Sequence, residues 1–294
     1  MVDWSNPYQD RRGGWLKGNL HAHTSPASGC AEVAPERVID LYIQAGFDFL
    51  AISDHMVLSE HQSSRIVLIP GVEWHSEAGE HTGIYSTDTK LIRSTLEIAD
   101  HRNLLDHLRG KEALVILNHP NWEMIPHYRR EVLESKRSYD GIEIYNAVIE
   151  GLVGCALSTD KWDYLLASGR RVLGFAGDDL HAEAHVGLAW ICVRTASAKA
   201  EGILSAIRQG NFYCSSGVEI TDIRAGGGLI EIETANAEEI HAISDGGRRV
   251  ARVTEKAIAF RAEGDSPTYV RFEAHGYGSA MAWTQPFFLR NDNA

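Results

Sequence analysis

The first two thirds of the chain alternates short apolar runs with helical patterns. Six runs are four to six residues long and almost free of polar side chains, which is typical of strands buried on both faces of a parallel sheet. They are Phe49–Ile52, Ile66–Ile69, Leu114–Leu117, Ile142–Tyr145, Val172–Ala176 and Leu188–Val193. Strands that alternate with helices indicate βα units, and therefore an α/β domain, either open or barrel-shaped.

Three segments have the apolar spacing of amphipathic helices. Val38, Leu41, Tyr42 and Ala45 recur at helical intervals, and Gly46 follows them as a stop signal. The same spacing recurs at Ala200, Ile203, Leu204 and Ile207, before Gly210. A third helix is expected to begin at Ser158 or Thr159 and to bury Trp162, Leu165 and Leu166.

The pattern changes after Gly210. Short alternating segments such as Leu229–Glu233, Ala257–Arg261 and Tyr269–Ala274 are separated by glycine-rich turns, which is typical of antiparallel strands. We therefore expect two domains, residues 1–212 with the α/β pattern and residues 213–294 as a small antiparallel β unit.

Composition excludes several classes of protein. The 294 residues contain 28 Lys and Arg against 40 Asp and Glu, a formal net charge of −12. This argues against nucleic acid as a partner, short oligonucleotides excepted, and against a polybasic membrane-surface protein. No run approaches the ~18 apolar residues of a membrane-spanning helix. The first ten residues lack the apolar stretch of a secretory signal, and the four cysteines are far apart. We expect a cytoplasmic protein with reduced thiols.

The 14 histidines are the unusual feature, and several stand at the ends of predicted strands beside other ligand-type residues. The blocks are His21-Ala22-His23-Thr24, Ser53-Asp54-His55, Gly71-Val72-Glu73, Asn118-His119-Pro120 and Gly177-Asp178-Asp179-Leu180-His181. Side chains at i and i+2 of an extended segment point the same way, ~6–7 Å apart. Residues beyond the carboxyl ends of parallel strands converge on one crevice. The blocks therefore predict a shared metal site.

These five blocks resemble the PHP (polymerase and histidinol phosphatase) domain family. The segments 15–24, 42–55, 210–217 and 282–286 are most similar to its CehA/McbA-like branch, so the resemblance covers nearly the whole chain. It implies a distorted (β/α)7 barrel, two or three divalent metal ions (Zn, Mn or Fe) and, in many members, hydrolysis of phosphoesters.

The resemblance also implies a ligand set. His21, His23 and Asp179 would bind the first ion, and Glu73 would bridge it to a second ion held by His119 and His81. His55 and His181 would bind a third. Two departures leave alternatives open. In the first, Ser28 and Gly29 stand where the family usually has an aspartate or histidine, so Cys30 could supply a ligand there. In the second, both His75 and His81 follow Glu73, so His75 is an alternative to His81 as the ligand of the second ion.

The expected activity is that of a metal-dependent hydrolase, most simply a phosphoesterase that attacks a small anionic substrate with a metal-bridged hydroxide. Glu73, Asp179 and His181 are the expected catalytic residues, with His181 or Asp54 as proton donor. Lys17, Arg194 and Arg224 are candidates for phosphate recognition. A carboxyl-ester or carbamate hydrolase with the same metals is the alternative, and a non-catalytic metal-binding module is a third reading.

The remaining histidines are expected to matter less. His185 could line the pocket. The others are expected to be exposed or to lie beside the ligands: His61, His101, His107, His127, His241 and His275.

Overall fold

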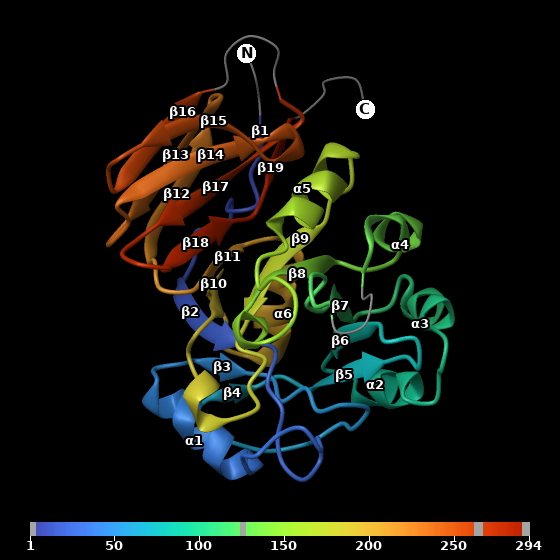
Figure 1. Cartoon of the computed structure of the whole chain (residues 1–294). Coiled ribbons are helices and arrows are strands. Elements are labelled where there is room, and N and C mark those ends of the chain that lie inside the picture. The colour runs from blue at the N-terminus through green and yellow to red at the C-terminus, as the bar shows by residue number, and fades with distance from the viewer. Residues whose placement is uncertain (1–3, 124–127, 262–266, 290–294) are drawn as a thin grey trace.

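A computed structural model describes residues 4–123, 128–261 and 267–289 (Figure 1). The helices are α1 (Pro35–Gln44), α2 (Thr89–Thr95), α3 (His101–Leu108), α4 (Arg130–Ser135), α5 (Thr159–Ala167) and α6 (Ala200–Arg208), with 3₁₀ turns η1 (Val148–Gly151), η2 (Glu183–His185) and η3 (Asp245–Gly247). Across these three ranges, no helix is long and apolar enough to cross a membrane.

The strands of the first part are β1 (Trp4–Ser5), β2 (Gly14–Asn19), β3 (Phe49–Leu50), β4 (Val67–Leu68), β5 (Gly71–His75), β6 (His81–Tyr85), β7 (Leu114–Leu117), β8 (Gly141–Asn146), β9 (Leu173–Gly177), β10 (Trp190–Thr195) and β11 (Phe212–Ser215). Those that follow are β12 (Ile220–Gly226), β13 (Leu229–Thr234), β14 (Glu239–Ser244), β15 (Arg248–Val253), β16 (Ala257–Arg261), β17 (Tyr269–His275), β18 (Met281–Thr284) and β19 (Phe287–Leu289).

The fold is a mixed α/β arrangement of three sheets. One sheet runs β1-β19-β17-β18-β11-β10-β2-β3-β4, with β14 and β15 attached beyond β17; the others are β5-β6-β7-β8-β9 and β12-β13-β16. All six apolar runs contain strands, and all three predicted helices form. The strands are only partly parallel: β2-β3-β4 and β7-β8-β9 are, whereas β5, β6 and β7 pair antiparallel. The distorted (β/α)7 barrel stays a prediction.

The antiparallel β5–β6 pair has a simple cause. Only residues 76–80 separate the two strands, and a connection this short allows a hairpin but not the crossover that a parallel pair needs. The hairpin brings the end of β5 beside the start of β6, so His75 lies directly opposite His81.

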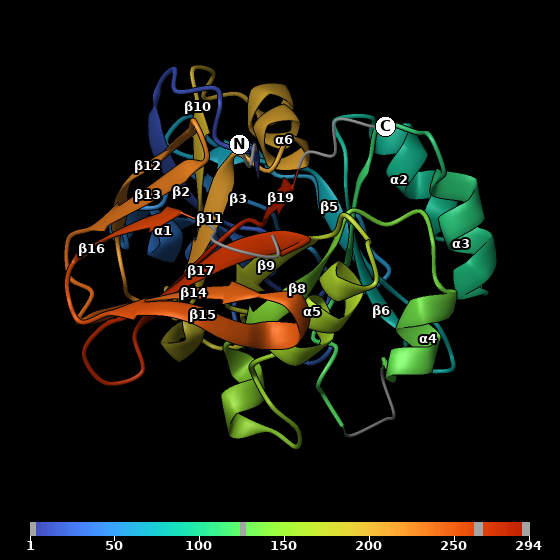
Figure 2. The same ribbon diagram turned by 90° about the horizontal axis from the view of Figure 1, so that it is seen from above.

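Every pairing among strands β12 to β19 is antiparallel. In Figures 1 and 2 these strands lie on the opposite side of the molecule from α2, α3 and α4. Of these strands, β12, β13 and β16 form the three-stranded sheet. The others are not a separate sheet, because β18 pairs with β11 and thereby joins β14, β15, β17 and β19 to the sheet that contains β10 and β2. The division of the chain at residue 212 stays a prediction.

Apolar side chains form a core between the elements of the first part. It includes Phe49, Trp74, Trp162 and Phe212. A separate cluster beneath α1 packs Val38 and Tyr42 against Leu50. These cores fix the strands whose ends carry the ligand-type residues.

Candidate metal centre

The structure gathers all eight predicted ligand residues into one cluster. Local backbone pairing explains why. Ala22 forms a bridge with Leu180, so the alternate side chains on either side of it come together: His21 and His23 from one segment, Asp179 and His181 from the other. A second bridge joins His55 to Glu73. His81 enters from β6 and His119 from the end of β7.

Glu73 lies at the middle of the cluster and is 1 % exposed. Its Oε1 atom lies 3.2 Å from His21 Nε2, 3.3 Å from His81 Nδ1 and 3.2 Å from His119 Nε2. Its Oε2 atom lies 3.3 Å from His23 Nε2 and 3.2 Å from His55 Nδ1. The two oxygens therefore contact different histidines, as those of a bridging carboxylate do, although His21 and His23, which the resemblance assigns to one ion, lie at different oxygens.

Asp179 supplies the second carboxylate. Its Oδ1 atom lies 3.2 Å from His21 Nε2 and 3.1 Å from His23 Nε2, and 3.6 Å from His181 Nδ1. The backbone of Asp179 has φ of 54°, and that of His119 has φ of 30°. Both values are uncommon for residues with a side chain and indicate local backbone strain.

The residues present fit a group of divalent ions. The imidazole atoms His21 Nε2, His23 Nε2 and His55 Nδ1, together with Asp179 Oδ1, are buried and make no hydrogen bond. Buried polar atoms in proteins normally have partners, so atoms that converge without bonding to one another indicate a shared ligand. Four overlapping triads have all ligand atoms within 4.8 Å: His23–His55–His181, His21–His23–Glu73, His21–His119–Asp179 and His55–Glu73–His81.

Neighbouring groups orient the imidazoles. His21 Nδ1 lies 2.8 Å from Glu143 Oε1, and His23 Nδ1 lies 3.3 Å from Ser28 Oγ. Each contact leaves the Nε2 atom facing the carboxylates. A carboxylate or hydroxyl behind a histidine is the usual support of a metal ligand.

The electrostatics favour cations. Burial would raise the pKa of Glu73, but His21 and His81 outweigh it and hold that pKa well below its usual value. Burial lowers the pKa of His23, yet Asp179 and Glu73 raise it to about 9. The two carboxylates thus draw positive charge into the site, either as protons or as metal ions.

Sequence reasoning missed Glu143, Asn146 and the role of Ser28. Glu143 also accepts the backbone N–H of His119 at 2.8 Å, and Asn146 Nδ2 donates to Glu143 and to Asp179. The signal for Glu143 was present, because it is a charged residue inside the apolar run Ile142–Tyr145, where burial requires a partner.

Several predicted alternatives lie elsewhere. His75 is exposed and belongs to none of the four triads. The thiol of Cys30 is exposed and likewise lies outside them, although it contacts His181. His185 accepts the backbone N–H groups of His181 and Ala182. His127 lies outside the described residues.

Asp54 does not face the cavity. It is fully buried and accepts hydrogen bonds from the backbone and hydroxyl of Thr24 and from Ser28 and Ser59. Its carboxylate fixes the loop that supports His23, so the predicted role of proton donor does not fit it.

The cluster opens into a cavity of about 80 Å³. Apart from the ligand-type residues, its lining is apolar and consists of Trp122, Val148, Ile149 and Leu152. No lysine or arginine of the described segments lines it. The predicted phosphate-binding cations are engaged elsewhere, since Lys17 lies over Trp190, Arg194 lies over Trp15 and Arg224 pairs with acidic side chains.

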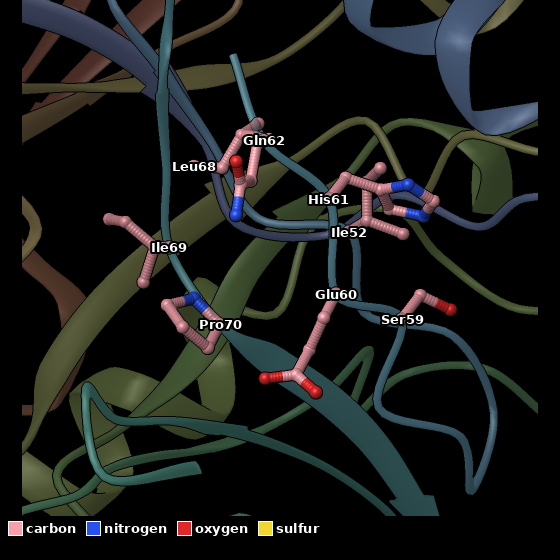
Figure 3. A pocket seen from close by; sticks show the side chains of 8 residues that line it. All are labelled: Ile52, Ser59, Glu60, His61, Gln62, Leu68, Ile69 and Pro70. Atoms are coloured by element: carbon pink, nitrogen blue, oxygen red, sulfur yellow. The ribbon is translucent and has the colours of Figure 1, made fainter.

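A second cavity, of about 180 Å³, lies beside the loop that follows His55 (Figure 3). Its lining is Ile52, Ser59, Glu60, His61, Gln62, Leu68, Ile69 and Pro70. Glu60 is paired with Arg93, and none of the eight clustered ligand residues reaches this cavity. We therefore place the chemistry at the smaller cavity.

Solved structures have a similar fold, although the chain matches no family model and no curated protein sequence. It is similar to a two-domain protein from Bacteroides vulgatus that contains a predicted PHP-like metal-dependent phosphoesterase (14% identity, TM-score 0.56, 98% of each chain covered). It is also similar to a lesion-specific endonuclease from Pyrococcus furiosus (11% identity, TM-score 0.52), covering 67% of this chain and 56% of that one. At these identities the likeness is one of fold.

Proposed function

We propose that this protein is a metal-dependent hydrolase of the PHP type, in its CehA/McbA-like branch, and that its substrates are small phosphoesters. The observation that carries the proposal is Glu73, whose two carboxylate oxygens face separate groups of histidines. The similarity in fold to a protein with a predicted metal-dependent phosphoesterase domain supports it.

The proposed ligands are those of the cluster. His21, His23 and Asp179 would hold one ion, His81 and His119 a second, and Glu73 would bridge the two. His55 and His181 would contribute to a third. Imidazole and carboxylate ligands suit Zn, Mn and Fe. When bound, such ions lower the pKa of a coordinated water and stabilise the negative charge that develops on the substrate.

The protein's own side chains have separate tasks. Glu143 and Ser28 hold the rings of His21 and His23 in place. His181 lies at the rim with its side chain 24 % exposed. Burial lowers the pKa of His181, but Cys30 and Asp179 raise it above its usual value overall. In a two-ion centre His181 would be the side chain placed to transfer a proton to the leaving group.

Metal content and a substrate panel test the proposal. Protein purified without chelator should contain at least two ions per chain, and less than one would contradict the metal centre. Glu73→Ala and Asp179→Ala should abolish hydrolysis while circular dichroism stays unchanged. The panel pairs p-nitrophenyl phosphate and bis(p-nitrophenyl) phosphate with p-nitrophenyl acetate and an aryl carbamate. Metals without turnover on any of these would favour a non-catalytic module.

The apolar lining supports a second candidate, a carboxyl-ester or carbamate hydrolase with the same ions. With no guanidinium or ammonium group lining the cavity in the described part of the chain, a neutral ester fits as well as a phosphate. Preference for the acetate and the carbamate would select this candidate. If the apolar lining binds the leaving group, Leu152→Ser should raise KM several-fold. Val153→Ser, next to it and 63 % exposed but outside the lining, is the matched control.

A further inference from the structure

A second cluster of histidine and glutamate side chains lies on the C-terminal strands. The register of β14 and β17 places His241 opposite Glu273 and Glu239 opposite His275. Residues two apart on a strand share a face, so all four side chains lie on one face of this strand pair. The intervening residues, Ile240 and Ala274, belong to the apolar core on the other face. His241 was expected to be exposed or beside the main site, but it is 8 % exposed and belongs to this separate cluster.

Three of these side chains converge. The ligand atoms of His241, Glu273 and His275 all lie within 4.8 Å of one another, and the two imidazole rings are 4.6 Å apart between centroids. His275 Nε2 is buried and makes no hydrogen bond. It lies 3.8 Å from Glu273 Oε2, which is too far for a hydrogen bond.

The surrounding charges orient the two carboxylates. Arg271 Nη1 donates to Glu273 Oε1 at 2.7 Å, which leaves Oε2 on the side of His275. Arg252 Nε donates to Glu239 Oε2 at 2.6 Å, and the other oxygen of Glu239 contacts His241 Nε2. A carboxylate on one nitrogen of a histidine leaves the other nitrogen available as a ligand.

We propose that His241 Nδ1, His275 Nε2 and Glu273 Oε2 form a separate binding site for one divalent transition-metal ion, best suited to Zn²⁺. Two imidazoles and one carboxylate match the ligand types of zinc, and water would complete the coordination. Ligands about 2.0–2.2 Å from one ion lie roughly 3.3 Å apart. The present separations are at most 4.8 Å, so the ligand atoms need to move closer by no more than about 1.5 Å. His275 has the freedom to do so, since its side chain is 34 % exposed. The ion would tie β14 to β17 and does not depend on the proposed hydrolase centre.

Crystals soaked in Zn²⁺ and measured at the zinc absorption edge test this site directly. We expect an anomalous peak about 2 Å from His241 and His275. Peaks confined to the Glu73 cluster, or no peak at all, would overturn the proposal.

Zinc counting in solution separates this site from the main one. His275→Ala should bind one equivalent of Zn²⁺ fewer than the wild type in competition with a chelator, keep wild-type turnover and lose part of the zinc-dependent rise in Tm. His107→Ala, a change on α3 outside both clusters, should bind as much as the wild type. Glu73→Ala should keep the ion on β14 and β17. An unchanged zinc count in His275→Ala would overturn the proposal, whatever the outcome at Glu73.

Discussion

Single residues at the cluster are held in costly conformations. The positive φ values of His119 and Asp179 cost on the order of 1–3 kcal/mol each, and the surrounding contacts hold them there. His119 donates its backbone N–H to Glu143, and the side chain of Asp179 accepts from Asn146. The strain directs both side chains toward the same point, as expected where a function requires that geometry.

Metal binding should release protons near neutral pH. Although burial lowers the pKa of His23, Asp179 and Glu73 raise it to about 9 in the metal-free protein, so its imidazole is protonated at pH 7. An ion must displace that proton, and affinity for Mn²⁺ should therefore rise between pH 7 and 9, by about tenfold per pH unit for each proton released. Above pH 9 the contribution of His23 to this rise should end.

Calorimetric titrations in buffers of different ionisation enthalpy measure this release. At pH 7 the apparent enthalpy should change from buffer to buffer. An enthalpy independent of the buffer, together with affinity that does not change from pH 7 to 9, would contradict the proposed state of His23.

The sequence indicates that His21 and His23 bind the same group, because residues two apart in an extended segment point the same way and this spacing can be read directly from the sequence. It indicates Glu73 only through its position at a strand end. Ser28 and Asn146 could not be assigned in this way, because their roles depend on which loop lies behind which ring. That proximity is produced by tertiary packing and leaves no trace in local spacing.

At the scale of elements, continuous apolar runs and clear helical spacing predict β3, β7 and β9 and the helices α1, α5 and α6. The short helices α2, α3 and α4 were missed, since six to eight residues give too few turns for a stable period. β1 was missed as well. Its two residues pair with β19, some 280 positions away, and such pairing is visible only in the folded chain.

Strand β8 has a role beyond the sheet, because Glu143 points from it into the cluster. Glu143→Gln should weaken metal binding about 10–100-fold. One oxygen of Glu143 accepts a hydrogen bond from His21, and the other accepts from the backbone N–H of His119 and from Asn146. In Glu143→Gln an NH₂ group replaces one of these oxygens, so it must face a hydrogen-bond donor and one of these bonds is lost. Competition with a chelator measures the affinity, and circular dichroism reports the fold.

Glu150→Gln, an exposed substitution on η1, is the control and should bind metal as the wild type does. If Glu143→Gln binds within twofold of the wild type, Glu143 has no part in orienting His21.

At the scale of the whole molecule, the C-terminal strands are connected to the rest by more than the chain. β18 extends the sheet through β11, and Trp283 stacks on Tyr145 of β8. A buried ion pair adds to this: Arg271 of β17 donates to both carboxylate oxygens of Asp163 of α5, at 2.7 and 2.6 Å. The pair is 2 % and 6 % exposed, so neither charge is solvated by water.

Removing one partner of this pair should therefore destabilise the entire protein. Asp163→Ala leaves the buried Arg271 guanidinium with Glu273 as its remaining carboxylate partner. The loss of both bonds to Asp163 should lower the free energy of unfolding by up to about 3–5 kcal/mol. The double variant Asp163→Leu with Arg271→Met removes both charges of this pair, leaves Glu273 beside His275, and should recover part of that loss. Asp160→Ala, exposed on the same helix, should cost less than about 1 kcal/mol. Urea unfolding followed by tryptophan fluorescence gives all four values.

Because the sheet and the ion pair both join the two parts, we expect one cooperative transition in the wild type. Two separate transitions, with Asp163→Ala shifting neither, would mean that the C-terminal strands fold independently of the α/β part.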